Sequence, residues 1–268
     1  MQKQLLLVTR QSPDWVGLAR DFKQGRPIDP DRFRPAESIP SFPENIVELV
    51  DLWNTHSPVD FFSCRARLKE IADDTIARLP DARRISCDEL DSIGAEIEKF
   101  VVFFHDDDDW YSPDLADYLP GNSTDSYDVL VFPLVRLWTD TITFVPDGRN
   151  ARTVVGQRKN FGFRYQSNNY GVNGSLRQQT PLMTMKDHIL ASAHAEACAL
   201  RDLYIDQAIG VTAKSPCSAS RLSVIFSEPD KAQEHVRAYV DGLAALEIPP
   251  EVNWIAERVD SVIELFSR

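Results

Sequence analysis

An apolar run that leads directly into a row of acids constrains the fold more than any other feature of this chain. Phe100 to Phe104 reads FVVFF and is followed at once by HDDDDWYSPDL. A short stretch of β-forming residues that is apolar on both faces is typical of a central strand covered by helices. Ligands of open α/β sheets collect beyond the carboxyl ends of such strands. The sequence therefore predicts an α/β fold with a candidate site at residues 106–109.

Other periodic patterns predict the elements around this strand. Leu5 to Val8 is expected to form a buried strand, and residues 128–137 and 141–145 a pair of strands. Helices are expected over residues 44–54, 68–79, 88–99, 114–118, 185–200, 231–246 and 251–266. Five prolines in residues 26–43 indicate an irregular excursion, and the polar residues 146–182 a long loop. We expect one catalytic domain over residues 1–226 and a C-terminal helical pair, residues 227–268, packed on the same domain.

Charge and cysteine content limit the partners. The net charge is −12, which makes DNA, RNA and acidic membranes poor partners. The four cysteines form no CxxC pair, so we expect reduced thiols rather than a zinc ribbon or a disulfide scaffold. The apolar run at the N-terminus is too short for a signal peptide or a membrane span, so a cytoplasmic protein is expected.

Four consecutive carboxylates at the end of a buried strand are electrostatically costly. Two like charges about 6 Å apart repel by roughly 3 kcal/mol at an effective dielectric constant near 20. Acidic runs are usually solvated surfaces, but this one has an apolar strand before it and Trp110 and Tyr111 after it. A cluster of hard oxygen donors in that position suits Mg²⁺ or Mn²⁺ carrying substrate phosphates.

The segment FVVFFHDDDDWYSPDL resembles the DxD segment of GT-A glycosyltransferases, in which an apolar strand ends in acids followed by an aromatic residue and a proline. LLLVTR and DPDRF also resemble bacterial rhamnosyltransferases. The resemblance implies a GT-A-like, Rossmann-like mixed sheet flanked by helices. It also implies transfer of a sugar from a nucleoside-diphosphate-sugar donor to a hydroxyl of a glycan or small-molecule acceptor. By position, Asp106 matches the first acid, Asp108 the second and Asp109 the neighbouring acid, all implied to hold the cation or the donor. His105 departs from the pattern, as does the proline-rich insertion.

Several basic residues are candidates for contact with the donor. Arg10 follows the first strand, where it either meets the donor or is an ordinary surface arginine. Arg158, Lys159 and Arg164 lie in the long loop and have the charge to complement a diphosphate. Lys214 opens a hydroxyl-rich turn that either binds phosphate or caps a helix.

An inverting transferase needs a base that deprotonates the acceptor hydroxyl. Asp187, at the start of a predicted helix, is the first candidate and Glu196 the second. An acid such as Asp187 in a first helical turn also complements the helix dipole, and that alternative stays open.

Three other classes compete with the transferase. A haloacid-dehalogenase-like phosphatase also places a DxD after an apolar strand, but its nucleophile strand is normally near the N-terminus. A two-metal nuclease is disfavoured by the negative charge. A GT-A-like binding module without catalysis is the third. GxSxG, HExxH, GxxxxGK[ST] and GxGxxG motifs are absent from the sequence, which disfavours the common hydrolase, protease, P-loop and dinucleotide-binding classes.

Overall fold

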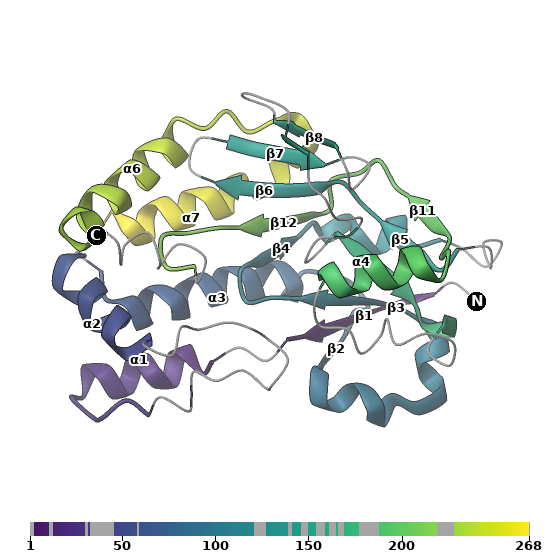
Figure 1. Ribbon diagram of the computed structural model, residues 1–268, viewed down its shortest axis with the longest axis horizontal. Coiled ribbons are helices and arrows are strands. Elements are labelled where there is room, and N and C mark those ends of the chain that lie inside the picture. The colour runs from purple at the N-terminus through teal and green to yellow at the C-terminus, as the bar shows by residue number, and fades with distance from the viewer. Residues whose placement is uncertain are drawn as a thin grey trace.

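The chain forms two six-stranded β-sheets with helices packed around them (Figure 1). The computed structural model describes residues 3–10, 13–29, 32, 46–57, 59–120, 127–138, 141–145, 150–153, 159–160, 165, 169–176, 188–218 and 228–267. The helices are α1 (Trp15–Lys23), α2 (Ile46–His56), α3 (Phe61–Ala77), α4 (His188–Ala197), α6 (Ala232–Ala244) and α7 (Ala256–Phe266).

The first sheet is mixed. Its spatial order is β11 (Asp202–Tyr204), β5 (Val129–Val131), β10 (Tyr170–Asn173), β3 (Phe100–His105), β1 (Gln4–Thr9) and β2 (Arg83–Ser86). β1 pairs in parallel with both β2 and β3, and β5 pairs in parallel with β11. β10 runs antiparallel to its neighbours β3 and β5. The predicted strand after residue 99 is therefore central, with a neighbour on each side.

Both faces of the central strands are buried, which explains why β3 and most of β1 and β5 are apolar. On one face Val8, Val102 and Phe104 pack with Ala191 and Ala195 of α4 and with the 3-10 helix Cys87–Lys99. On the other face the alternate residues of the same strands pack with the end of α3 and the 3-10 helix Pro113–Tyr118.

The first strand of the second sheet, β4 (Asp109–Tyr111), follows directly after β3 of the first sheet in the chain. The order of the second sheet is β4, β12 (Gly210–Ala213), β6 (Leu134–Trp138), β7 (Thr141–Val145), β8 (Asn150–Thr153) and β9 (Lys159–Asn160). Because β3 ends at His105 and β4 begins at Asp109, residues 106–108 form the turn between the two sheets. α3 holds β4 in place, because the Tyr111 amide donates to the hydroxyl of Thr75 at 3.2 Å.

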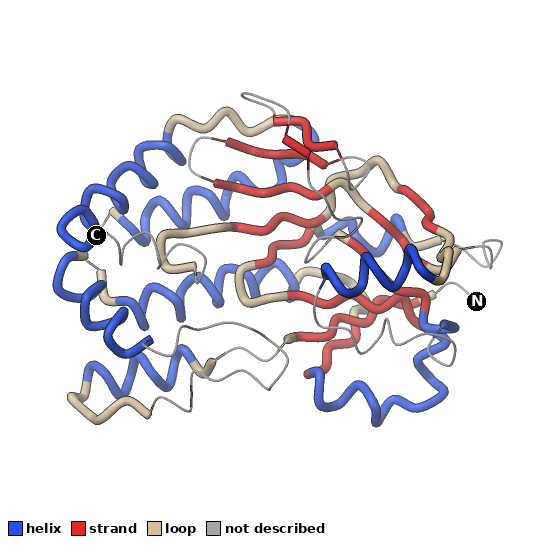
Figure 2. Tube along the Cα trace, viewed as in Figure 1, coloured by secondary structure: helices blue, strands red, loops and turns tan. Residues whose placement is uncertain are grey.

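In the view shared by Figure 1 and Figure 2, α1, α2 and α6 lie at the left and α4 lies at the right. α1, α2, α3, α6 and α7 share one hydrophobic core with residues of β4 and β12. The Asp14 and Asp60 side chains accept hydrogen bonds from first-turn amides of α1 and α3, which fixes where these two helices begin. Two short 3-10 helices, Pro229–Lys231 and Pro250–Ile255, precede α6 and α7. No helix among the described residues has the length and apolar character needed to cross a membrane.

The structure confirms the predicted α/β class and differs from the prediction in several elements. The strand expected over residues 128–137 is two strands in different sheets, interrupted at Phe132 and Pro133, because proline lacks the amide that a continuous ladder requires. The helix expected over residues 88–99 is a 3-10 helix with a kink at Gly94. The loop expected over residues 146–182 contains β8, β9 and β10. The predicted domain boundary at residue 226 and most of the proline-rich stretch lie outside the described residues.

Candidate functional site

The acidic residues lie at the carboxyl ends of two adjacent parallel strands, β1 and β3. From β1 the chain leads through α1, α2 and α3 to β2 on one side, whereas from β3 it leads to β4 and then to β5 on the other. The connections thus diverge between β1 and β3, which is the position where open α/β sheets bind ligands. Arg10 follows β1 at this point, and its amide donates to the His105 carbonyl at 3.0 Å.

The buried side chain of Asp109 stabilises the turn through two hydrogen bonds. Its side chain accepts hydrogen bonds from the Asp106 amide at 2.7 Å and from the Thr212 hydroxyl at 3.2 Å. Thr212 lies directly opposite Asp109 in the β4–β12 ladder, which accounts for the second contact. Asp109 is fully buried. It therefore shapes the turn and does not fit the metal-ligand role predicted from its position in the sequence.

Asp106 faces Arg10. Both carboxylate oxygens of Asp106 lie 3.1 Å from Nη1 of Arg10. The Arg10 side chain is only 5% exposed, whereas that of Asp106 is 32% exposed. Of the two alternatives for Arg10, the ordinary surface arginine is therefore excluded. Arg10 lies behind Asp106 and leaves one side of that carboxylate open to solvent.

Asp107 is tied to two helices. It accepts a hydrogen bond from the indole N–H of Trp15 on α1 at 2.6 Å and another from Arg65 on α3. The Arg65 guanidinium also stacks over the Trp15 ring, 4.9 Å from its centroid. This buried contact joins α1, α3 and the acidic turn.

Asp108 faces a second turn, residues 214–218, which follows β12. The Lys214 ammonium lies 3.6 Å from Asp108 Oδ2, and the Ser218 hydroxyl donates to the same oxygen at 3.4 Å. The turn closes on itself through a hydrogen bond from the Ser218 amide to the Ser215 carbonyl. The Lys214 side chain is 33% exposed, so this cation and Asp106 are the more accessible groups of the cluster.

The His105 side chain links the ends of β1 and β3. Its Nε2 lies 2.8 Å from the Thr9 hydroxyl and its Nδ1 lies 3.3 Å from the Asp106 carbonyl. Burial lowers the pKa of His105 to about 4, so the ring is neutral at pH 7. Because a carbonyl only accepts, Nδ1 carries the proton and Nε2 accepts from Thr9.

Three acids of the cluster have a cationic partner among the described residues. Arg10 pairs with Asp106, Arg65 with Asp107 and Lys214 with Asp108. Burial raises the pKa of Asp108, which Lys214 offsets only in part, and burial together with the charges of Asp106 and Asp108 raises the pKa of Asp109 well above its usual range. For Asp107, the opposing effects of Arg65 and Trp15 outweigh burial and lower the pKa. Asp108 and Asp109 are thus the acids of the turn whose protonated forms are favoured by burial.

A metal ion at the acidic turn would need ligands besides the described side chains. Within the part of the chain that the structure describes, no group of three or more histidine, cysteine, aspartate or glutamate side chains is arranged to hold a metal ion. Mg²⁺ commonly uses one or two carboxylates and takes its other ligands from water and substrate phosphates. Asp106 offers such oxygen atoms with a side chain that is 32% exposed, whereas Asp107 and Asp108 are only 12% and 11% exposed and Asp109 is fully buried.

Other predicted residues lie elsewhere. Glu196 is exposed at the end of α4, and this position gives no support to its predicted role as a base. Asp187, Arg158 and Arg164 lie outside the described residues, and Lys159 is described only as part of the backbone of β9. The roles of these five residues stay predictions.

Sequence reasoning did not identify Trp15, Arg65 or Ser218 as neighbours of the acids. Trp15 and Arg65 lie on α1 and α3, each more than thirty positions before β3 begins at Phe100. One sequence signal could have pointed to Arg65. It lies between Cys64 and Ala66 on the buried face of a helix, and a buried arginine normally has an acidic partner.

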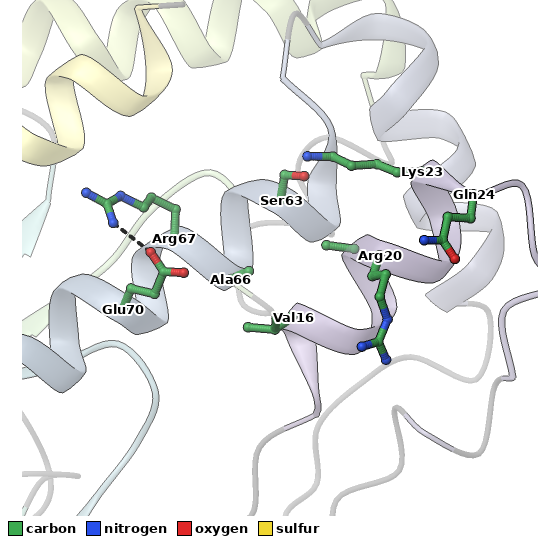
Figure 3. A pocket seen from close by; sticks show the side chains of 9 residues that line it. Val16, Arg20, Lys23, Gln24, Ser63, Ala66, Arg67 and Glu70 are labelled. Carbon is green, nitrogen blue, oxygen red and sulfur yellow. Dashed lines mark hydrogen bonds and ion pairs between the residues drawn. The ribbon is translucent and has the colours of Figure 1, made fainter.

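A shallow groove of about 490 Å³ lies between α1 and α3. Figure 3 shows Val16 on α1 pointing toward Ala66 on α3, whereas Arg67 on α3 points toward Glu70. None of the four aspartates of the turn lines this groove. We therefore place the candidate site at the acidic turn and not in the groove.

Neither a protein-family model nor a curated protein sequence matches this chain.

Proposed function

We propose that this chain is a metal-dependent glycosyltransferase that transfers a sugar from a nucleoside-diphosphate-sugar donor to an acceptor hydroxyl. The donor diphosphate would lie at the carboxyl ends of β1 and β3, together with Mn²⁺ or Mg²⁺. Asp106 and Asp108 would supply the protein oxygens to the cation. The sequence resemblance to the DxD segment and the mixed sheet both support this proposal.

The single observation that carries the proposal is the gathering of four carboxylates at the divergence point between β1 and β3. Burying a carboxylate in its charged form costs free energy unless a cation or hydrogen bonds compensate it. Here burial raises the pKa of Asp108 although Lys214 is beside it. A divalent cation at Asp108 would favour the charged form of that carboxylate.

The residues of the chain would act mainly by positioning and by electrostatics. When bound, the cation would neutralise the charge that develops on the leaving diphosphate. Arg10 holds the Asp106 carboxylate, and the hydrogen bond from the Asp106 amide to Asp109 holds its backbone, so little reorganisation is needed when substrate arrives. Lys214 adds a cation that can turn toward a phosphate oxygen, because its side chain is one-third exposed and its contact with Asp108 is long.

A thermal-shift screen tests the proposed function. The purified protein is melted with a panel of nucleoside diphosphates, each with and without Mn²⁺. We expect at least one nucleotide to raise the melting temperature only when Mn²⁺ is present, because ligand binding to the folded state stabilises it. If no nucleoside diphosphate stabilises the protein in either condition, the proposal fails.

Asp108→Asn tests the residue on which the proposal depends. We expect this variant to lose at least tenfold in Mn²⁺-dependent affinity for the stabilising nucleotide, measured by calorimetry, while keeping a cooperative melt. Asp117→Asn is the matched control, because Asp117 is an exposed acid in the nearby 3-10 helix and should bind as the unmodified protein does. Unchanged affinity in Asp108→Asn would contradict the assignment.

A binding module without catalysis is the second candidate. It is favoured by the ion pairs of Arg10, Arg65 and Lys214, which already engage three of the four acids. The transferase and the binding module can be distinguished by supplying the stabilising nucleotide as a nucleoside-diphosphate sugar. Slow release of free nucleoside diphosphate in the presence of Mn²⁺ indicates a transferase, whereas binding without any release indicates a module.

A further inference from the structure

Two buried cysteines from distant parts of the chain lie against each other. Sγ of Cys64 on α3 and Sγ of Cys217 in the 214–218 turn are 3.0 Å apart. Neither is in a disulfide, and both side chains are buried. A disulfide requires about 2.0 Å between the sulfur atoms, so an approach of roughly 1 Å would join α3 to the turn.

The cysteine pair adjoins the acidic turn on both sides. Cys64 precedes Arg65, which holds Asp107, and Cys217 precedes Ser218, which donates to Asp108. Any bond between the two sulfur atoms therefore couples α3 to the segment that carries Lys214 and Ser218. The other two cysteines, Cys87 and Cys198, lie in other parts of the fold, on a 3-10 helix and at the end of α4.

We propose that Cys64 and Cys217 form a redox modification site, in which peroxide converts the two thiols to a disulfide that locks the 214–218 turn onto α3. The thiolate of one cysteine attacks hydrogen peroxide, giving a sulfenic acid and one water molecule after proton transfer. The second thiol then displaces the hydroxyl group from that sulfur, giving the disulfide and a second water molecule. The two thiols lose two electrons and two protons in total, and the peroxide takes up both.

Hydrogen peroxide is the oxidant because of its size. Both sulfur atoms are shielded from solvent, and a bulky disulfide such as glutathione disulfide would have to insert its own sulfur between them. Burial also raises the pKa of the Cys64 thiol, which slows attack in the closed state. The turn is held by hydrogen bonds from the Lys214 amide to the Leu137 carbonyl and from the Tyr239 hydroxyl to the Lys214 carbonyl. Oxidation thus depends on transient opening of the turn, and the disulfide afterwards prevents that opening.

The experiment uses the full-length double variant Cys87→Ser/Cys198→Ser, which keeps only the buried pair. It is treated with hydrogen peroxide and digested without reduction. We expect one peptide that joins Cys64 to Cys217, with a mass lower by two hydrogen atoms than the two reduced peptides together. Recovery of both peptides as thiols, or as separate sulfinic acids, would overturn the proposal.

Hydrogen exchange measures directly whether the disulfide restricts opening of the 214–218 turn, and it needs no substrate. In the oxidised double variant we expect slower exchange of the amides in the 214–218 turn than in the same variant after reduction. Cys64→Ala on the double-variant background is the control, because it retains Cys217 but cannot form the bond and should exchange alike with and without peroxide. Equal or faster exchange after disulfide formation would show that the bond does not lock the turn. Because neither readout involves nucleotide or metal, failure of the proposed function would leave this test intact.

Discussion

At the scale of single residues, the contact of Arg65 with Asp107 holds the acidic turn against two helices. Arg65 has one amino group on Asp107, and its Nε and Nη1 have no hydrogen-bond partner among the described residues. Its guanidinium therefore depends on the charge of Asp107 and on stacking against Trp15 for stabilisation. Removing one partner of such a buried pair is costly, since the other charge is left uncompensated.

We predict that Arg65→Met lowers the free energy of unfolding by about 3–5 kcal/mol. Urea denaturation followed by tryptophan fluorescence measures this change. Arg67→Met is the matched control, because Arg67 lies two residues away on α3 and its exposed ion pair with Glu70 should contribute less than about 1 kcal/mol. Equal stability of the two variants would show that the buried pair does not anchor the turn.

At the scale of elements, the edge of the first sheet is closed by Asp128 and Arg201. The Asp128 carboxylate accepts hydrogen bonds from the Arg201 amide at 2.8 Å, from its Nε at 3.1 Å and from its Nη2 at 2.9 Å. These contacts fix where β11 meets β5. The hydrogen bonds from the Arg201 side chain, only partly offset by burial, lower the pKa of Asp128.

This shift sets a direction for the pH dependence of stability. A carboxyl group with a lowered pKa in the folded state stabilises the protein above its unfolded pKa of about 3.9, and the contribution is lost as the pH falls through the folded pKa. We expect Asp128→Asn to melt a few degrees below the unmodified protein at pH 7 and the difference to shrink below about pH 4. Arg201→Gln should follow the same curve, since it breaks the same pair. A difference that stays constant down to pH 3 would rule out this origin.

The elements that were predicted correctly are those whose pattern is local. The FVVFF strand, α6 and α7 follow from apolar runs or helical spacing. β10 was missed because its sequence, YGVN, combines a glycine with a polar end. Gly171 is required there by a distant contact, because a Cβ atom at this position would lie 2.5 Å from the Phe103 ring of β3. Such a requirement exists only once the two strands are paired.

At the scale of the whole molecule, the site is made by the meeting of two sheets. The sequence predicted the acids after β3 and Arg10 after β1, because strand ends can be read locally. It did not predict the second sheet, in which β12 brings Thr212 to Asp109 and the 214–218 turn to Asp108. Pairing between residues about one hundred positions apart leaves no periodic signal in either segment.

The arrangement has a consequence for metal binding. The proposed function gives the cation two protein ligands, the partly exposed Asp106 and the largely buried Asp108, and leaves the remaining ligands to the substrate, since no group of three or more potential ligands was found among the described side chains. Mn²⁺ should therefore bind weakly to the protein alone and much more tightly once a nucleoside diphosphate supplies phosphate oxygens.

Electron paramagnetic resonance of Mn²⁺, titrated into the protein with and without the nucleoside diphosphate that stabilises it, tests this account most directly. We predict that the nucleotide lowers the dissociation constant of protein-bound Mn²⁺ at least tenfold, and that Asp108→Asn removes this gain. Mn²⁺ that stays unbound to the protein in both titrations would contradict the account.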